Sequence, residues 1–190
     1  MFEILYKITG IEELQKTLNE NCFDVESDIL GWFAFYVNGN EYGDYLYDPS
    51  RPNADGWMRI TDWFVNLILA YRELNRSSYV LIDDIDSYIA WIELRKINDM
   101  VKISTIKAEK KDGIFCELRL TPFNHFEYYT WYDQPVKLNE IQSELTKKAS
   151  LYISELQTIN IKLLGNKKVA ELVELISFLE RDRKECLSPN

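Results

Sequence analysis

The dipeptide Asn38-Gly39 stands between two β-prone runs rich in aromatic residues, and it constrains the fold more than any other local feature. Asparagine and glycine both tolerate a positive φ, which a type I′ turn requires at its two central positions. The dipeptide therefore predicts a β-hairpin with a two-residue loop, and this loop length fixes which residues face one another. The expected pairs are Val37 with Asn40, Phe35 with Tyr42, Phe33 with Asp44, Tyr36 with Glu41 and Trp32 with Tyr45.

Along the rest of the chain, the spacing of apolar residues switches between the period typical of strands and the period typical of helices. Short β-prone runs bounded by turn residues predict further strands at residues 2–9, 78–85, 87–95, 100–108, 113–120 and 125–132. Pro135 is expected to end the last of these strands, because proline cannot donate a hydrogen bond to a neighbouring strand. Apolar residues at spacings of three and four predict helices at residues 11–22, 61–75, 138–159 and 167–183. Thr61 is expected to cap the second helix, with Asp62 in its first turn.

These elements predict an α+β fold with a largely antiparallel sheet, a packed amphipathic helix and a C-terminal helical hairpin. We expect residues 1–135 to form the α+β sheet domain and residues 136–190 to form the helical hairpin, packed together as one structural unit. A chain of 190 residues is long enough to bury a core without disulfides or a structural metal. The three widely spaced cysteines show no metal-binding spacing, which agrees with reduced thiols in the cytoplasm.

The acidic residues are concentrated in the first half of the chain. The formal net charge is −9, and residues 1–100 hold 18 of the 31 acidic side chains but only 8 of the 22 basic ones. An acidic surface repels the phosphates of nucleic acids and of anionic membranes, so we expect neither as a partner. The N-terminal residues lack the pattern of a signal peptide, and no apolar run is long enough to cross a bilayer. The charge favours a basic protein as the partner.

Acidic and aromatic side chains are mixed in the predicted hairpin and in the loop that follows it. Aromatic residues beside charged ones are typical of protein-interaction sites, so this segment is the first candidate for a partner-binding surface. The candidate residues here are Glu41, Tyr42, Asp44, Tyr45, Asp48, Asp55 and Trp57. The alternative is a core hairpin whose acidic residues are solvated at its rim.

A second acidic group follows the apolar run at residues 79–82. Asp83, Asp84 and Asp86 offer hard oxygen ligands of the kind that Mg²⁺ and Ca²⁺ prefer, but the stretch lacks the order of an EF-hand loop. Aspartate is also common in turns, so we favour a turn at the end of a strand. The three residues join the candidate partner-binding surface, and a small metal-dependent hydrolase that uses their carboxylates remains an alternative.

Motifs for catalysis and for cofactor binding are missing from the sequence. The single histidine, His125, lies among aromatic residues without a nucleophile or a metal-ligand motif, and we expect it to have no chemical role. The seven glycines form no phosphate-binding loop. We therefore expect no catalytic residue, no metal site and no cofactor.

Three segments in the first part of the chain carry a resemblance to a known family. They are the hairpin GWFAFYVNGNEYG, the helix TDWFVNLILAY and the strand segment SYIAWIEL. Their order, over about residues 1–110, resembles the small acidic bacterial immunity proteins of polymorphic or contact-dependent toxin systems. Membership of this family implies no catalysis, because such proteins bind a toxin domain and block its active site or its assembly. The toxins are often nucleases with basic clefts, in which an acidic inhibitor can mimic a phosphate backbone.

The sequence thus favours a cytoplasmic, non-catalytic inhibitor that neutralises a bacterial toxin domain through an acidic, aromatic surface. Two alternatives stay open. One is the metal-dependent hydrolase, and the other is an adaptor domain that oligomerises through its C-terminal helices.

Overall fold

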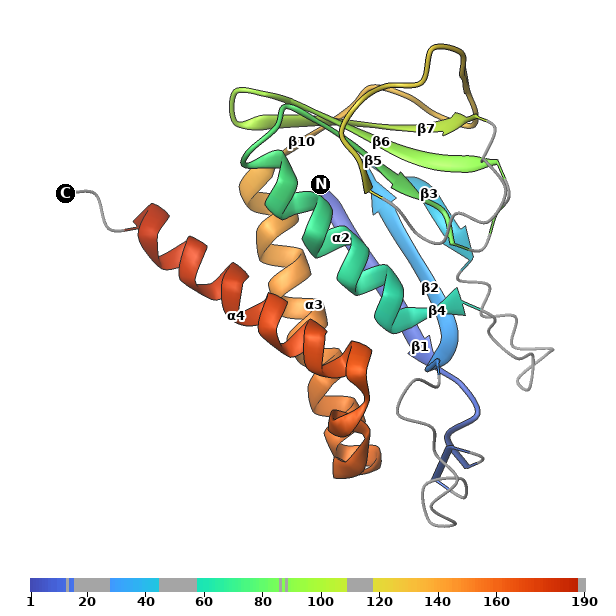
Figure 1. Cartoon of the computed structure of the whole chain (residues 1–190), viewed down its shortest axis with the longest axis vertical. Coiled ribbons are helices and arrows are strands. Elements are labelled where there is room, and N and C mark those ends of the chain that lie inside the picture. Colours follow the sequence, from blue (N-terminus) through green and yellow to red (C-terminus); the bar gives the residue numbers. More distant parts are fainter. Residues whose placement is uncertain are drawn as a thin grey trace.

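The computed structural model has the α+β architecture that the sequence predicts (Figure 1). The described residues are 1–12, 14–15, 28–44, 58–85, 87, 89–108 and 118–187. Two antiparallel sheets lie on one side of the molecule, and long helices lie on the other side. Most of the predicted helix at 11–22 and of the predicted strand at 113–120 falls outside the described residues.

The first sheet contains the predicted hairpin. Its strands are β1 (Phe2–Ile8), β2 (Leu30–Val37), β3 (Asn40–Asp44) and β4 (Met58–Arg59), and β2 pairs with the other three. Asn38 and Gly39 have positive φ angles of 52° and 86°, as a type I′ turn requires. The register of β2 with β3 confirms four of the five predicted facing pairs. The fifth pair involves Tyr45, which lies outside the described residues.

The second sheet is centred on three antiparallel strands. Its strands are β5 (Tyr79–Asp83), β6 (Ala90–Ile97), β7 (Met100–Lys107), β8 (Leu118–Arg119), β9 (Glu127–Tyr128) and β10 (Gln134–Lys137). β7 pairs with β6 along one side and with β9 and β10 along the other. The prediction that Pro135 ends a strand is wrong, because Pro135 lies inside β10. An edge strand tolerates proline, since half of its N–H groups have no strand partner.

A turn joins β5 to β6, as predicted for the aspartate cluster. The amide of Ser87 donates to the carbonyl of Asp84 at 3.2 Å, and the amide of Asp84 donates to the carbonyl of Ala90 at 3.2 Å. The amide of Ala90 in turn donates to the hydroxyl of Ser87 at 3.2 Å. Because these bonds hold the chain in the turn, β6 begins at Ala90 and not at residue 87.

Long helices lie together on one side of the sheets (Figure 1). They are α2 (Ile60–Leu74), α3 (Leu138–Ile159) and α4 (Lys167–Leu187), and the 3₁₀-helix η1 (Ile161–Gly165) connects the last two. The predicted bounds of α3 are confirmed, and α4 extends beyond its predicted end at residue 183. α2 contacts both sheets and both of the later helices.

One apolar core joins the two sheets to the three long helices. Phe64 of α2 is fully buried in it, with its ring centroid 5.3 Å from that of Phe33 in β2 and 5.3 Å from that of Tyr152 in α3. Leu172 and Leu179 of α4 are fully buried in the same core. The C-terminal helices therefore pack on their own chain.

Thr61 belongs to this core and does not cap α2. Its side chain is 3% exposed, and its hydroxyl oxygen lies 2.7 Å from the hydroxyl oxygen of Tyr152. Arg59 occupies the N-cap position and makes no side-chain cap hydrogen bond. The predicted Thr61 cap is wrong, because this hydroxyl pairs with a buried tyrosine of another helix. Asp62 does lie in the first turn, as predicted.

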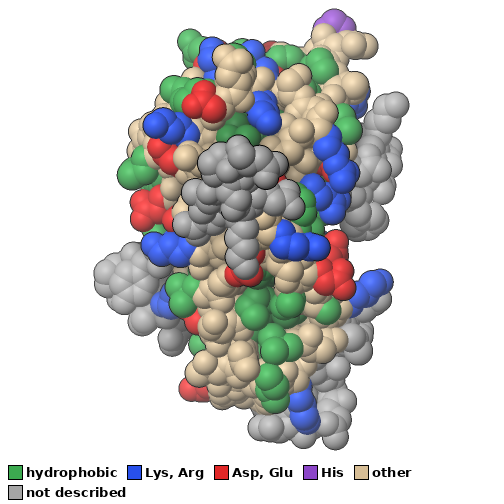
Figure 2. Space-filling model, turned by 90° about the vertical axis from the view of Figure 1, so that its left-hand side faces the viewer, with side chains coloured by type: hydrophobic (Ala, Val, Ile, Leu, Met, Phe, Trp, Pro, Cys, Tyr) green, Lys and Arg blue, Asp and Glu red, His purple; other side chains and the backbone are tan. Residues whose placement is uncertain are grey.

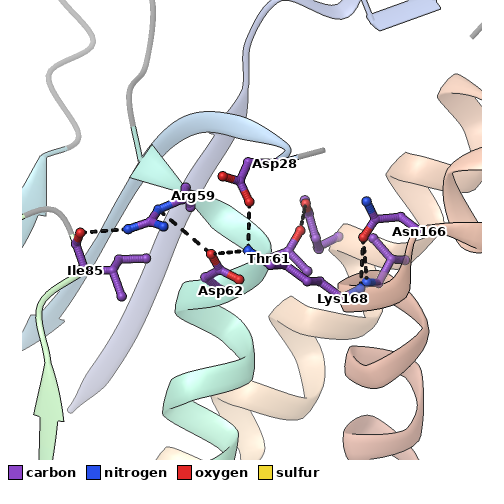
Figure 3. Close-up of polar contacts among 9 residues, drawn as sticks. Asp28, Arg59, Thr61, Asp62, Ile85, Asn166 and Lys168 are labelled. Atoms are coloured by element: carbon purple, nitrogen blue, oxygen red, sulfur yellow. Dashed lines mark hydrogen bonds and ion pairs between the residues drawn. The ribbon is translucent and has the colours of Figure 1, made fainter. Parts of the chain in front are cut away.

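A cluster of charged side chains ties the start of α4 to the start of α2 (Figure 3). Nζ of Lys168 lies 2.8 Å from a carboxylate oxygen of Asp28 and 2.8 Å from one of Asp62. Burial alone would lower the pKa of Lys168, but the hydrogen bonds to Asp28 and Asp62 outweigh burial and raise the pKa above 10.5. Arg59 extends the cluster by donating to the carbonyl of Ile85 at 2.7 Å.

Replacing Lys168 with methionine is expected to lower the free energy of unfolding by about 1 kcal/mol near neutral pH, the scale of a partly exposed ion-pair network. The folded-state pKa is raised, so this contribution is fully present below pH 10.5 and is lost as the pH rises through the folded-state pKa. Urea unfolding of both proteins from neutral to strongly alkaline pH measures the difference. A difference that stays constant over the whole range would show that the ammonium group contributes nothing.

Candidate functional site

An open cleft lies where the two sheets approach each other. Its volume is about 420 Å³, and ligand sites usually have about 300–1,000 Å³. The first sheet supplies residues of β2, β3 and β4, and the second sheet supplies the β5–β6 turn and the start of β6. The lining includes Trp32, Glu41, Tyr42, Gly43, Asp84 and Tyr129.

Among the described residues, the first sheet and the turn after β5 each contribute one acidic residue to the lining of this cleft. Glu41 is exposed on β3, and Asp84 follows the end of β5. The hydroxyl of Tyr42 donates to Oδ2 of Asp84 at 2.6 Å. Tyr42 is 8% exposed, and its ring stacks on that of Phe35 with the centroids 5.2 Å apart. A buried ring thus holds the carboxylate of Asp84 in place.

The segment between β9 and β10 closes one wall of the cleft. The indole Nε1 of Trp131 donates to the backbone carbonyl of Glu41 at 3.0 Å, which joins the second sheet to the edge of β3. Tyr129 of the same segment lines the cleft, and Nζ of Lys107 lies 3.9 Å from the centroid of its ring. Trp32 adds a half-buried indole from β2. Carboxylates between aromatic walls are suited to binding a cation.

The cleft brings together three residues of the predicted partner-binding surface, Glu41, Tyr42 and Asp84. Asp83 is 2% exposed and does not line the cleft, so its predicted part in partner binding stays a prediction without support from this site. Its neighbour Asp84 lies beyond the strand end, whereas Asp83 is the last residue of β5 and pairs with Trp91. Only the backbone of Asp44 is described. The other predicted residues, Tyr45, Asp48, Asp55, Trp57 and Asp86, lie outside the described residues.

A second polar cluster, not expected from the sequence, lies on the second sheet. This outer cluster consists of Tyr79, Glu93, Arg95, Lys102 and Asp133. Glu93 is 2% exposed, accepts a hydrogen bond from the hydroxyl of Tyr79 at 3.1 Å, and lies 3.3 Å from Nε of Arg95. Asp133 pairs with Arg95 and lies 3.1 Å from Nζ of Lys102. The cluster therefore joins β5, β6 and β7 to the segment before β10.

One part of the outer cluster has a signal in the sequence. Glu93 and Arg95 are two residues apart in a strand, so they share one face, while Ile92 and Leu94 point to the apolar core. Charged residues at alternate positions of an otherwise apolar strand indicate a charged pair on that face. No such pattern identifies Asp133 as the partner, because it lies far away in the sequence. Its backbone has a positive φ of 53°, which no local pattern indicates either.

The pKa values of the outer cluster indicate a structural role. Burial alone would raise the pKa of Asp133, but the hydrogen bond and charge of Lys102 and the charge of Arg95 lower it below 3.8. Burial raises the pKa of Tyr79, and the carboxylate of Glu93 raises it further. At neutral pH Asp133 is therefore ionised, as its ion pair with Lys102 requires, and Tyr79 is protonated, as its hydrogen bond to Glu93 requires.

The histidine, the possible metal ligands and the helices of the described residues are further features that could serve a function. His125 is exposed in the connection between β8 and β9. Within the described ranges, no group of three or more His, Cys, Asp and Glu side chains is placed to hold a metal ion. None of the described helices has both the length and the apolar character needed to cross a membrane.

Comparisons of this chain with protein-family models, with curated proteins and with solved structures find no match.

Proposed function

We propose that this chain is a non-catalytic, immunity-like protein that neutralises a basic bacterial toxin domain by binding it. The cleft between the sheets is the observation that carries the proposal. Glu41 and Asp84 come from different sheets but share one open, aromatic-walled space. Acidic and aromatic side chains in an open cleft are suited to a basic protein surface.

The distribution of charge supports the same proposal. The excess of acidic side chains lies in the first half of the chain, which also supplies all of the cleft except the segment around Tyr129 and Thr130. An acidic face speeds the encounter with a basic partner, with association rates up to about 10⁸–10⁹ M⁻¹s⁻¹ at low salt. The resemblance of about residues 1–110 to immunity proteins points to a toxin domain as that partner, and to the cytoplasm as the place of action.

Co-expression of this chain with the protein encoded by the neighbouring gene tests the proposed function. We expect the two proteins to elute together, and we expect the chain to protect cells in which the neighbouring protein alone is toxic. The matched control is an inert domain expressed to the same level. Persistent toxicity with no joint elution, at an excess of folded chain, would contradict the proposal.

The hydrolase alternative predicts a response to divalent metals that we do not expect. Mg²⁺ or Ca²⁺ should leave the melting temperature unchanged, because Asp83 is buried and only Asp84 of the aspartate cluster lines the cleft among the described residues. A bound ion at 100 times its dissociation constant would instead stabilise the fold by about 2.7 kcal/mol. Thermal unfolding with EDTA and with each ion measures this. A clear rise in melting temperature with one ion would favour the hydrolase.

An apolar surface on the helices favours the adaptor as a second candidate. Figure 2 shows apolar side chains gathered on the lower part of the helical face. Leu151 of α3, Ile161 of η1 and Val173 of α4 are 48%, 59% and 40% exposed. Sedimentation velocity over a wide concentration range distinguishes the candidates. We expect a monomer, whereas a dimer that Val173→Glu dissociates would favour the adaptor.

A further inference from the structure

The cleft between the sheets offers a cation two kinds of contact at once. The carboxylates of Glu41 and Asp84 accept hydrogen bonds, and the aromatic side chains of Trp32 and Tyr129 form its walls. The ammonium group of Lys107 lies 3.9 Å from the centroid of the Tyr129 ring and occupies that face of the ring, so the aromatic wall left for a partner's cation is Trp32.

The groups around the cleft are held before any partner arrives. Tyr42 fixes Asp84 through the hydrogen bond of 2.6 Å, and Trp131 fixes the backbone of Glu41 through the bond of 3.0 Å. Sites that are held in their binding geometry lose less conformational entropy on association. The carboxylate of Asp84 and the backbone at the edge of β3 therefore need little rearrangement to receive a side chain, and the exposed side chain of Glu41 orients on binding.

Arginine fits this arrangement better than lysine does. Its guanidinium group is planar, carries five N–H donors and is weakly hydrated, so it can bond to carboxylates at its edge while an aromatic ring contacts its face. The ammonium group of lysine is a strongly hydrated point charge, and it loses more hydration between aromatic walls.

The openness of the cleft indicates that the cation belongs to a larger partner. Small-molecule sites usually enclose about 70–90% of their ligand, whereas this cleft opens widely to solvent. A side chain that projects from a protein surface can enter from the open side while its backbone stays outside.

We infer that the cleft receives one arginine side chain of the partner protein, held by Glu41 and Asp84 and flanked by Trp32. This inference rests on the proposed function and adds the mode of recognition to it. The arginine is the central anchor of the interface, and the acidic residues around it guide the approach.

A pair of blocked tripeptides tests the inference without the natural partner. One is acetyl-Gly-Arg-Gly-amide, and the other carries citrulline, which has the shape of arginine without its charge. We expect the arginine peptide to shift the amide signal of Gly43 and the indole signal of Trp32 in ¹⁵N-correlated spectra of the full chain. Its dissociation constant should be on the order of 1–10 mM, because a few contacts must offset the lost freedom of the peptide. The citrulline peptide should cause no saturable shift.

Two cleft variants and one distant variant locate the binding. Glu41→Gln and Asp84→Asn keep the shapes of the side chains, and each should weaken the arginine peptide by about fivefold, the upper range for a partly exposed ion pair. Glu171→Gln on α4 removes one exposed carboxylate far along the chain and should have no effect. Equal weakening by Glu171→Gln, equal binding of the citrulline peptide, or shifts confined to other surfaces would overturn the inference.

The inference and the proposed function can fail separately. Selective arginine binding in a chain that neutralises no neighbouring toxin would support the cleft assignment and contradict the function. Neutralisation that is unaffected by Glu41→Gln and Asp84→Asn, with no arginine binding, would support the function and overturn the cleft assignment.

Discussion

Replacing Gly31 with alanine is expected to lower the free energy of unfolding by about 3 kcal/mol, the upper range for an overpacked core. Gly31 lies in β2, between Ile8 of β1 and Met58 of β4. A Cβ atom at this position would overlap the carbonyl oxygen of Lys7 and would lie 2.5 Å from Cδ1 of Ile60. The backbone of β1 cannot move away without breaking its pairing with β2, so the strain remains in the folded state.

The matched control for this substitution is Gly165→Ala in η1. A Cβ atom there meets nothing within 4 Å, so the change should alter stability by no more than about 0.5 kcal/mol. Urea unfolding of both variants measures the two effects. Equal stability of the Gly31 and Gly165 variants would show that β1 and β2 are not packed as closely as described.

Replacing Arg95 with alanine is expected to cost about 2 kcal/mol, because the change leaves Glu93 buried without its cation. Loss of one partner from a fully buried ion pair costs about 3–5 kcal/mol, and the side chain of Arg95 is 34% exposed, which reduces the effect. Lys96→Ala, at the next position of β6, removes the same charge and should change stability by about 0.5 kcal/mol or less.

A second substitution tests the cause of this loss. Glu93→Gln in the Arg95→Ala background removes the buried charge, and it should restore part of the lost stability. Glu93→Gln is also measured alone, because the coupling between the two sites is the stability change of the double variant minus those of the two single variants. Losses that simply add would show that the pair is not coupled and that only the packing of the arginine stem matters.

Local chemistry explains which parts of the fold are predictable. The register of β2 with β3 follows from Asn38-Gly39, because a two-residue loop leaves one possible pairing. The bounds of α3 follow from its apolar spacing. The Thr61 cap and the strand end at Pro135 were predicted wrongly for a common reason. In both cases a tertiary contact decided the outcome, with Tyr152 in the first case and the sheet edge along β7 in the second.

The candidate site was only partly predictable, because it depends on how the two sheets meet. The composition of the hairpin identifies Glu41 and Tyr42, and the aspartate cluster identifies Asp84. No local pattern shows that they meet, since the bond between Tyr42 and Asp84 joins different sheets. Tyr129 was missed for the same reason, because its segment reaches the cleft by following the edge of β7.

Association kinetics with the co-purified partner domain test the central claim, that the acidic cleft binds a basic protein. Glu41→Lys in the cleft is compared with Glu171→Lys on α4, so that both variants have the same net charge and both changes are at exposed positions. We predict that Glu41→Lys lowers the association rate constant by about tenfold at low salt and weakens its salt dependence, whereas Glu171→Lys has a much smaller effect. The same rate constant and the same salt dependence for both variants would contradict the claim.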